Sequence, residues 1–247
     1  MLNIVIPMAG AGSRFANAGY QMPKPLIDVA GQTMIEVVIN NLRPSCQHRF
    51  IFICQASHIV EFGLEQKLRN WAPGCEIVAV DGVTQGAACT VLAAKHFINN
   101  DDALMIANSD QFIEIDIDAY LASLGNLDGL IMTMKANDPK WSYVGFGPDG
   151  LVESVVEKKV ISDDATVGIY NFAKGRDFVA SALAMIEADI RTNGEFYVAP
   201  VYNMMIQAGA RIGIFGVGQV GAGMYGLGTP EDLDAFLHSS ICSKAAA

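Results

Sequence analysis

Positive charge is scarce in this chain of 247 residues, which has 16 lysines and arginines against 26 aspartates and glutamates. The formal net charge of −10 argues against a nucleic-acid partner, because binding to a phosphate backbone requires basic surfaces. A nucleotide remains compatible with this charge, since a few local cations and backbone N–H groups can hold one phosphate chain. We therefore expect small-molecule partners and no nucleic acid.

Cysteines are also few, and long apolar runs are missing. The five cysteines form no CxxC pair and no Cys/His spacing, which is typical of reduced thiols in a reducing compartment. No apolar run approaches the roughly 18 residues of a membrane-spanning helix. The apolar run Ile4–Ile6 is too short for a signal-peptide core and follows no basic stretch. The sequence therefore predicts a cytoplasmic protein with no membrane partner.

The stretch between Ile6 and Ile35 is unusually polar for a connection between two apolar segments. It contains Gly10, Gly12, Arg14 and Lys24, whereas a simple connection in an α/β unit needs only about two to six residues. We expect an extended loop here, with the next helix beginning at about Thr33. A loop of this length that contains two cations indicates a binding function.

Apolar runs rich in β-branched residues alternate with amphipathic segments through the first half of the chain. The expected strands cover residues 4–9, 49–54, 76–80 and 103–107, and the expected helices cover 34–42, 58–68 and 86–97. Four strand-like runs follow, over 129–137, 142–146, 151–158 and 166–172. Helices over 176–189 and 199–207, a strand over 211–217 and a helix capped by Thr229 complete the chain. This order predicts an α/β fold with a mixed, mainly parallel sheet.

We expect a single domain, 1–247, with a nucleotide-binding half (1–125) and an acceptor-binding half (126–247). Ligands of open α/β sheets bind beyond the carboxyl ends of the strands. Both the long loop after the first strand and the segment "NSDQ" after the fourth strand lie at that edge. A dinucleotide-binding motif would have its third glycine where Phe15 stands, which argues against that motif.

The ordered motifs resemble those of the sugar-phosphate nucleotidyltransferases, whose familiar members are the glucose-1-phosphate thymidylyltransferases. The resemblance covers nearly the whole chain and implies a Rossmann-like, three-layer α/β/α (GT-A-like) fold. The chain is similar to short members of this family from capsule and surface-polysaccharide pathways. The motifs that carry it are GAGSR, PKPL, GQTMI, QGAACTVLAA, SDQ, VEKK, VGIYNF, NGEFYV and GTPEDL.

The resemblance implies Mg²⁺-dependent transfer of a nucleoside monophosphate from an NTP to a sugar 1-phosphate, with release of pyrophosphate. The product of such a reaction would be a nucleotide sugar. All reactants are anions, and two unit charges 4 Å apart repel by about 4 kcal/mol at an effective dielectric constant near 20. The site therefore needs cations. By resemblance, Arg14 stabilises the leaving pyrophosphate, Lys24 lies along the line of attack, and Asp110 binds the metal.

The resemblance also implies residues that bind the two substrates. The expected nucleotide-binding residues are Met8, Ala9, Gly10, Ala11, Gly12, Ser13, Gln85, Gly86 and Asn108. The expected acceptor-binding residues are Trp141, Glu157, Lys158, Gly168 and Glu195. Gly226 stands where the family has a second metal-binding aspartate, and Glu231 or Asp232 could replace it.

Several alternatives stay open on the sequence alone. A cytidylyltransferase for a phosphocholine- or phosphoamino-type acceptor would share these motifs. A nucleotide-sugar-dependent glycosyltransferase would need a D-x-D motif where Asn108-Ser109-Asp110 stands. A non-catalytic nucleotide-binding homologue is the third alternative. The base, the acceptor and assembly into a homo-oligomer are not determined by these residues.

Overall fold

Buried β-branched runs form the parallel half of a central sheet. β1 (Leu2–Pro7) pairs in parallel with β4 (His48–Gln55) and with β6 (Ala103–Ala107), and β4 pairs in parallel with β5 (Glu76–Val80). Near-continuous burial of β1 is typical of a strand that is covered on both faces. The computed structural model describes residues 1–245, and the last two residues of the expected domain, 246–247, lie outside this part.

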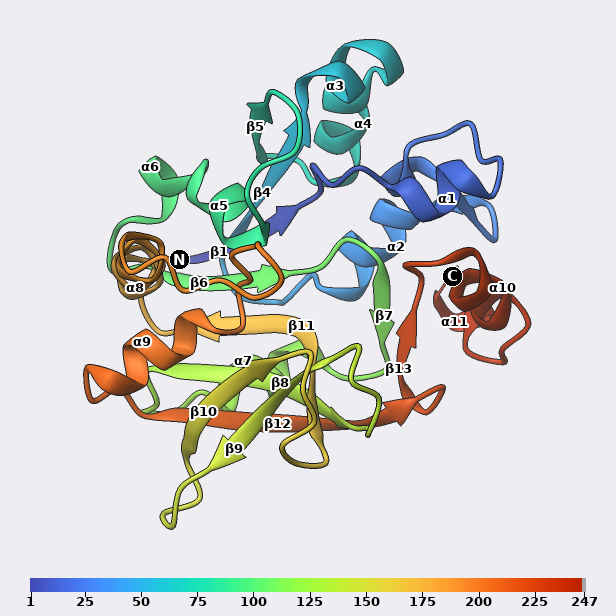
Figure 1. Ribbon diagram of the computed structural model, residues 1–247. Coiled ribbons are helices and arrows are strands. Elements are labelled where there is room, and N and C mark those ends of the chain that lie inside the picture. Colours follow the sequence, from blue (N-terminus) through green and yellow to red (C-terminus); the bar gives the residue numbers. More distant parts are fainter. Residues whose placement is uncertain (246–247) are drawn as a thin grey trace.

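The second half of the chain extends the same sheet with mixed pairing. The sheet has 11 strands, in the order β5-β4-β1-β6-β11-β8-β12-β13-β7, with β9 joined to β11 and to β10 (Figure 1). β8 pairs in parallel with β12, and β11 is antiparallel to both β6 and β8. The expected α/β class with a mixed sheet is therefore confirmed. The strands of this half are β7 (Gln111–Ile113), β8 (Gly129–Lys135), β9 (Ser142–Phe146), β10 (Val152–Glu157), β11 (Asp164–Phe172), β12 (Ile212–Val220) and β13 (Gly223–Gly226).

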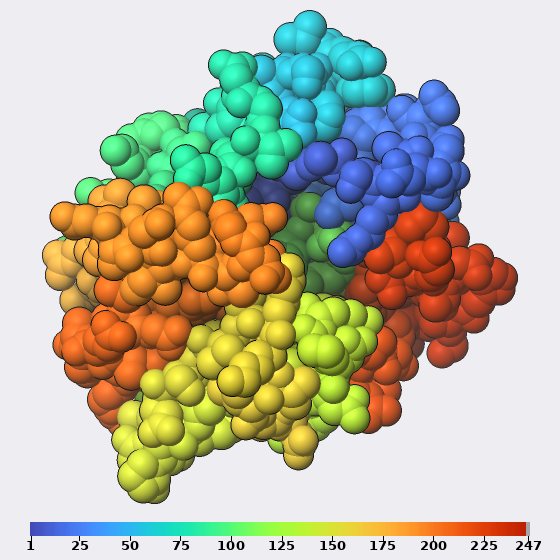
Figure 2. Space-filling model, in the orientation of Figure 1, coloured from blue at the N-terminus to red at the C-terminus, as the bar shows by residue number. Residues whose placement is uncertain are grey.

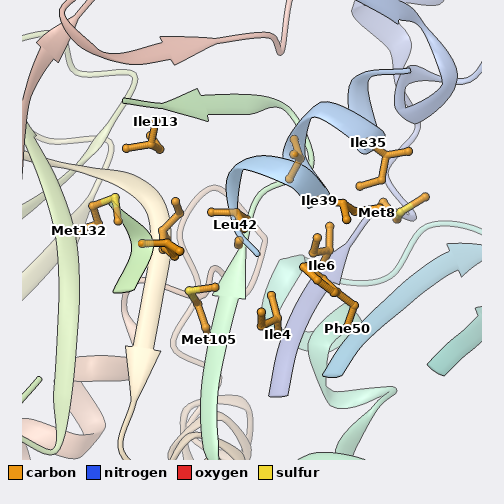
Figure 3. Packing of buried hydrophobic residues seen from close by; sticks show 14 of the residues in the cluster. Ile4, Ile6, Met8, Ile35, Ile39, Leu42, Phe50, Met105, Ile113 and Met132 are labelled. Carbon is orange, nitrogen blue, oxygen red and sulfur yellow. The ribbon is translucent and has the colours of Figure 1, made fainter. Parts of the chain in front are cut away.

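Helices cover both faces of the sheet, which confirms the three-layer arrangement. One apolar cluster lies beneath α2 (Met34–Asn41), α3 (Ala56–Phe62), α4 (Leu64–Trp71) and α7 (Ile117–Ala122). Figure 3 shows α2 residues of this cluster packed against β1 and β4. The other cluster lies beneath α5 (Ala87–Leu92), α6 (Lys95–Ile98), α8 (Gly175–Glu187) and α9 (Val201–Gln207). Within residues 1–245, every helix is too short or too polar to cross a membrane.

A third apolar cluster joins the C-terminal helices to the N-terminal loop. Phe15 of α1 (Ser13–Asn17) is 1% exposed, and it belongs to the same cluster as Leu233 and Phe236 of α10 (Pro230–Leu237). This contact brings the last part of the chain, which ends in α11 (Cys242–Ala245), to the edge of the sheet where the first loop lies (Figure 1).

The structure corrects several expected boundaries. The expected long loop contains α1, a 3-10 turn η1 (Lys24–Leu26) and a small hairpin of β2 (Asp28–Val29) and β3 (Gln32–Thr33), so the first helix begins well before Thr33. The expected helix over 58–68 is two helices, because Gly63 adopts a left-handed φ of 59° between them. The expected helix over 86–97 is also divided, into α5 and α6.

Candidate active site

Two loops that follow parallel strands bring opposite charges together. Lys24 Nζ, from the loop after β1, lies 2.9 Å from Asp110 Oδ2, which follows β6. The side chains are 25% and 23% exposed, so the pair is reachable from solvent. Gly12 lies beside Lys24 in this loop and has a φ of 61°, in the left-handed region that favours glycine. The expected meeting of the two loops at the carboxyl edge is present in the structure.

Arg14 connects this ion pair to a larger cleft. It lines a cavity of about 220 Å³ together with Lys24 and Asp110, and a second of about 320 Å³ with Asn108 and Asp110. It also lines a third cavity of about 390 Å³. Its guanidinium has no ion pair within residues 1–245, so its charge is available to an anion. Figure 2 shows the hollow, bordered by the blue N-terminal segment, the orange segment before α9 and the red C-terminal segment.

Asn108 is held at the floor of the cleft by a glycine in β11. Its backbone N–H donates to Gly168 O at 3.0 Å. Gly168 has a φ of 78° and lies at an irregularity in the pairing of β11 with β8. A Cβ on Gly168 would lie 2.0 Å from Asn108 Nδ2. Residue 168 must therefore be glycine for Asn108 to keep this position.

Gly168→Ala is expected to destabilise the protein and to reduce turnover, because the methyl group displaces Asn108. Gly209→Ala is the matched control, since Gly209 has a φ of 88° and a methyl group added there would meet no heavy atom within 4 Å. The control carries only the backbone cost of about 1–2 kcal/mol. Urea unfolding should show a loss for Gly168→Ala at least about 1 kcal/mol larger than for the control. Equal losses would contradict the steric role of Gly168.

The third cavity contains the residues expected to bind the acceptor. Trp141, Glu157, Lys158 and Gly168 all line it. Glu157 is partly buried and accepts a hydrogen bond from the Ser142 hydroxyl. Burial raises the pKa of Glu157, the Ser142 hydrogen bond and the Lys158 charge lower it, and Glu195 adds a smaller rise. Glu195 itself is exposed and does not line this cavity.

Lys158 has a fixed position at the wall of this cavity. It adopts a left-handed φ of 55°, and its backbone N–H donates to Trp141 O at 3.0 Å. Its Nζ donates to the Tyr197 hydroxyl at 2.6 Å. This hydrogen bond raises the pKa of Lys158, so the side chain is a cation at neutral pH.

The expected nucleotide-binding residues occupy three different environments. Met8 and Ala9 are each 4% exposed, the Met8 N–H donates to Ile53 O, and Ala9 O accepts from Gln55. Gly10 and Ala11 line a separate groove beside α3, which Gly12 shares. Residues 12–14 line the cavity that contains Lys24 and Asp110. The structure thus brings residues 12–14, but not Met8 and Ala9, to the cleft.

Gln85 and Gly86 lie against the segment that precedes α9. Gln85 O accepts a hydrogen bond from Phe196 N at 2.9 Å. Gly86 has a φ of 130°, and a Cβ there would lie 2.5 Å from Phe196 O. The next residue, Ala87, lines the third cavity. This close approach explains why a glycine stands at position 86.

The structure also places Asp232 in the cleft, in the second cavity with Asp110. Asp232 belongs to the first turn of α10, where its N–H donates to Thr229 Oγ1 at 3.1 Å, as the sequence predicted for a helix capped by Thr229. Its carboxylate lies beside Gly226, because a Cβ on Gly226 would be 3.4 Å from Asp232 Oδ2. The carboxylate of Asp232 is thus next to position 226.

The donor set suits a hard cation that also binds substrate. No group of three or more His, Cys, Asp and Glu side chains is placed to hold a metal in the part of the chain that the structure describes. Asp110 and Asp232 offer two carboxylates in one cavity. Mg²⁺ is usually held by one or two carboxylates, with water and substrate phosphates as its other ligands. These residues therefore fit Mg²⁺ that is bound together with a triphosphate.

Solved structures of similar fold include a pyrophosphorylase and a CTP transferase. A nucleoside-diphosphate-sugar pyrophosphorylase from Vibrio cholerae RC9 has 26% identity and a TM-score of 0.80, with 96% of this chain and 100% of that chain covered. The inositol-1-phosphate CTP transferase from T. maritima has 15% identity and a TM-score of 0.71, with coverage of 99% and 94%. At that identity, the second similarity shows the fold alone.

Curated relatives agree over part of their length. The "Bifunctional protein GlmU" of Methanococcus maripaludis (strain S2) is 24% identical over 223 residues, which are 86% of this chain and 49% of that protein. The chain therefore spans about half the length of the curated relatives it matches. The family model described as "Nucleotidyl transferase" matches residues 4–196. The motifs and this match together show that the chain belongs to the nucleotidyl transferase family of enzymes.

Proposed function

We propose that the protein transfers a nucleoside monophosphate from an NTP to a sugar 1-phosphate and releases pyrophosphate, with Mg²⁺ as cofactor. The observation that carries this proposal is the convergence of Arg14, Lys24 and Asp110 on one cavity. The V. cholerae relative is named a nucleoside-diphosphate-sugar pyrophosphorylase, which supports a sugar phosphate as acceptor. The proposed product is a nucleotide sugar for surface-polysaccharide synthesis.

Lys24 and Arg14 would stabilise different parts of the negative charge of the reacting phosphates. The Lys24 ammonium has three N–H donors, of which one points to Asp110, so two can meet phosphate oxygens. The planar Arg14 guanidinium can hold two oxygens of the leaving pyrophosphate at once. An acceptor phosphate oxygen attacks the α-phosphorus, and the bond from that phosphorus to the oxygen of the leaving pyrophosphate breaks. The attacking phosphate is already ionised near neutral pH, so no general base is needed.

Mg²⁺ would supply further positive charge to the triphosphate when it is bound. Asp110 and Asp232 are the side chains that would hold it. Lys24 orients the Asp110 carboxylate through the 2.9 Å contact. The backbone N–H groups of Gly12 and Ser13 lie at the same cavity and can bind phosphate oxygens.

The charge of the third cavity favours a sugar phosphate over a cationic acceptor. Its charged lining residues are Arg14, Lys140, Lys158 and a single acid, Glu157. Lys140 Nζ lies 5.1 Å from the centre of the Trp141 ring, where a quaternary ammonium group would otherwise bind. Lys158 would bind the acceptor phosphate, and Glu157 would accept hydrogen bonds from acceptor hydroxyls.

Glu157→Gln is expected to weaken acceptor binding and to stabilise the fold at neutral pH. Burial raises the pKa of Glu157, so the folded state binds the proton of this carboxyl more tightly than the unfolded state does. The resulting contribution to the free energy of unfolding is complete below the unfolded-state pKa of about 4.3 and is lost as pH rises through the folded-state pKa. The variant should therefore unfold at a higher temperature than the wild type at neutral pH, and this gain should vanish below about pH 4. The KM for the acceptor should rise about tenfold. A lower unfolding temperature for the variant at neutral pH would contradict the assigned cost of the buried charge.

A pyrophosphate-release screen tests the proposed function. CTP, UTP, dTTP, GTP and ATP are each combined with sugar 1-phosphates, inositol 1-phosphate, phosphocholine and phosphoamino compounds, in the presence of Mg²⁺. We expect release with one NTP and a sugar 1-phosphate, and none without acceptor. Release only with phosphocholine or phosphoamino compounds would instead establish the cytidylyltransferase alternative. NTP binding with no release from any pair would support the non-catalytic alternative.

A further inference from the structure

Gln111, the first residue of β7, has a buried amide that the fold itself does not satisfy. The residue is 3% exposed. Its Nε2 is fully enclosed and has no hydrogen-bond partner within residues 1–245. Its Oε1 accepts no hydrogen bond within these residues either, and it is not fully enclosed. Buried amides in native proteins normally have partners, because an unpaired one pays its desolvation without compensation.

The position of this amide separates it from the other unpaired polar groups of the interior. Within residues 1–245, the other side chains with an enclosed and unpaired polar atom are Asn3, Thr33, Thr133 and Asn171. None of these four lines any of the three cavities of the cleft. Gln111, in contrast, lines the second cavity together with Asp110 and Asp232. Its unpaired amide therefore indicates a ligand in that cavity.

The pairing of β7 with β13 places the Gln111 side chain near the Asp232 carboxylate. Gln111 lies directly opposite Gly226 in this antiparallel pair. Opposite residues point to the same face of the sheet, with Cβ positions about 4.5–5.5 Å apart. A Cβ on Gly226 would lie 3.4 Å from Asp232 Oδ2. Gln111 and Asp232 are thus both neighbours of position 226 at the wall of the second cavity.

The same pair of strands holds the Asp110 carboxylate beside these two side chains. Leu227 N donates to Asp110 O at 2.8 Å, which continues the hydrogen bonding beyond the end of β13. A Cβ on Gly228 would lie 2.6 Å from Asp110 Oδ2, so the carboxylate lies against this glycine. Asp110, Gln111 and Asp232 therefore border one short segment, 226–228, and line one cavity.

The chemistry of the three side chains is that of a site for a hard divalent cation. Two of them are carboxylates, and the third offers the carbonyl oxygen of a neutral amide. Carboxylate, carbonyl and water oxygens are the ligands that Mg²⁺ and Mn²⁺ prefer. A phosphate oxygen could approach three such acceptors only with a cation between them, since none of them donates a proton from these oxygens.

We propose that Gln111 is a ligand, through Oε1, of the metal ion that binds with the NTP in the cavity it shares with Asp110 and Asp232. This inference rests on the proposed function, because it takes a metal bound to a triphosphate as the ligand. The amide oxygen has no partner until the metal is bound, so the free protein keeps Gln111 at a cost to its stability. Removal of the amide should therefore weaken metal binding and stabilise the free protein.

Calorimetry and thermal unfolding test both consequences. Each variant is titrated with the NTP that supports pyrophosphate release, once with Mn²⁺ and once with EDTA, and always without acceptor. We expect Gln111→Leu to bind the Mn²⁺–NTP complex about tenfold more weakly than the wild type, and metal-free NTP within about twofold of it. Without ligand, Gln111→Leu should unfold at a temperature about 2–4 °C higher, since leucine has no amide to bury.

Thr133→Val is the matched control. Thr133, in β8, is 0% exposed, its Oγ1 has no partner within residues 1–245, and it lines none of the three cavities. This variant should also unfold at a higher temperature, but it should bind NTP as the wild type does with and without Mn²⁺.

Gln111→Glu distinguishes the amide oxygen from the shape of the side chain. Glutamate keeps an oxygen at the position of Oε1 and adds a negative charge. The variant should therefore bind the Mn²⁺–NTP complex at least as tightly as the wild type, and metal-free NTP more weakly.

The outcomes separate this inference from the proposed function. Wild-type affinity of Gln111→Leu for the Mn²⁺–NTP complex would overturn the metal-binding role while the proposed function stands. Equal losses with and without Mn²⁺, or the same loss of Mn²⁺–NTP affinity in Gln111→Glu, would overturn it too, because the amide would then act through its shape. A lower unfolding temperature for ligand-free Gln111→Leu would show that the amide stabilises the fold, which also contradicts the inference. Failure of the wild type to bind any NTP would overturn the proposed function itself.

Discussion

Lys24→Met is expected to lower kcat by roughly 10²- to 10³-fold, and Arg14→Met is expected to cause a loss of similar size. Methionine keeps most of the length of the lysine side chain and removes its charge, so the substitution tests the charge itself. The physical reason is that the nucleophile, the reacting phosphate and the leaving group are all anions. A preorganised cation stabilises charge that develops in the transition state, so the loss should appear in kcat more than in KM.

Stability measurements distinguish this loss from unfolding. The Lys24–Asp110 pair is only about one-quarter exposed, so removal of Lys24 leaves a largely buried carboxylate unpaired and should lower the free energy of unfolding by about 1–3 kcal/mol. A loss of this size leaves a domain of ordinary stability folded in the assay. Lys67→Met is the control, because Lys67 is an exposed residue of α4 that lines none of the three cavities. Turnover of this control should equal that of the wild type. Wild-type turnover in Lys24→Met and Arg14→Met would remove both residues from the proposed site.

Asp110→Asn should abolish tight metal binding and lower kcat by roughly 10²- to 10³-fold, because an amide oxygen carries no charge for the metal. Metal binding is measured as the loss of the free Mn²⁺ signal in electron paramagnetic resonance, with NTP present and acceptor absent. Since Asp110 pairs with Lys24 and lines the cavity formed with residues 12–15, which Asp232 does not line, we expect a larger effect from the loss of Asp110 than from the loss of Asp232.

Asp232→Asn should reduce Mn²⁺ affinity about tenfold in the same titration, if it supplies the carboxylate missing at Gly226. Asp234→Asn is a control from the same helix, because its side chain is 74% exposed and does not line the cavity. Mn²⁺ affinity equal to that of the wild type in Asp232→Asn would show that Asp232 acts only at the start of α10.

Sequence patterns predicted the parts of the fold that local chemistry determines. β6 is a continuous apolar run, and β1 is apolar except for Asn3. The rule that ligands bind at the carboxyl ends of strands placed Arg14, Lys24 and Asp110 at one edge. Thr229 and Pro230 marked the beginning of α10 correctly, because capping depends on adjacent residues.

Long-range contacts determine the parts that the sequence did not reveal. β7 and β13 are short strands defined by long-range pairing, of β7 with β13 and of β13 also with β12, and a run of three or four residues carries little periodicity. α1 is only five residues long and is stabilised by the burial of Phe15 against α10. Gln111 and Gly226 lie far apart in the sequence, so no local pattern could pair them.

The fate of the two ends of the NTP tests most directly whether this cleft performs nucleotidyl transfer. NTP labelled at the α-phosphate or at the γ-phosphate is mixed with acceptor and Mg²⁺, and the labelled products are separated after a single turnover. The α-label should appear in the acceptor product and the γ-label in pyrophosphate, in equal amounts, with both rates reduced together in Lys24→Met. Appearance of the α-label in free nucleoside monophosphate, or of the γ-label in orthophosphate, would contradict this mechanism. Formation of the labelled products by Lys24→Met at the wild-type rate would contradict it too.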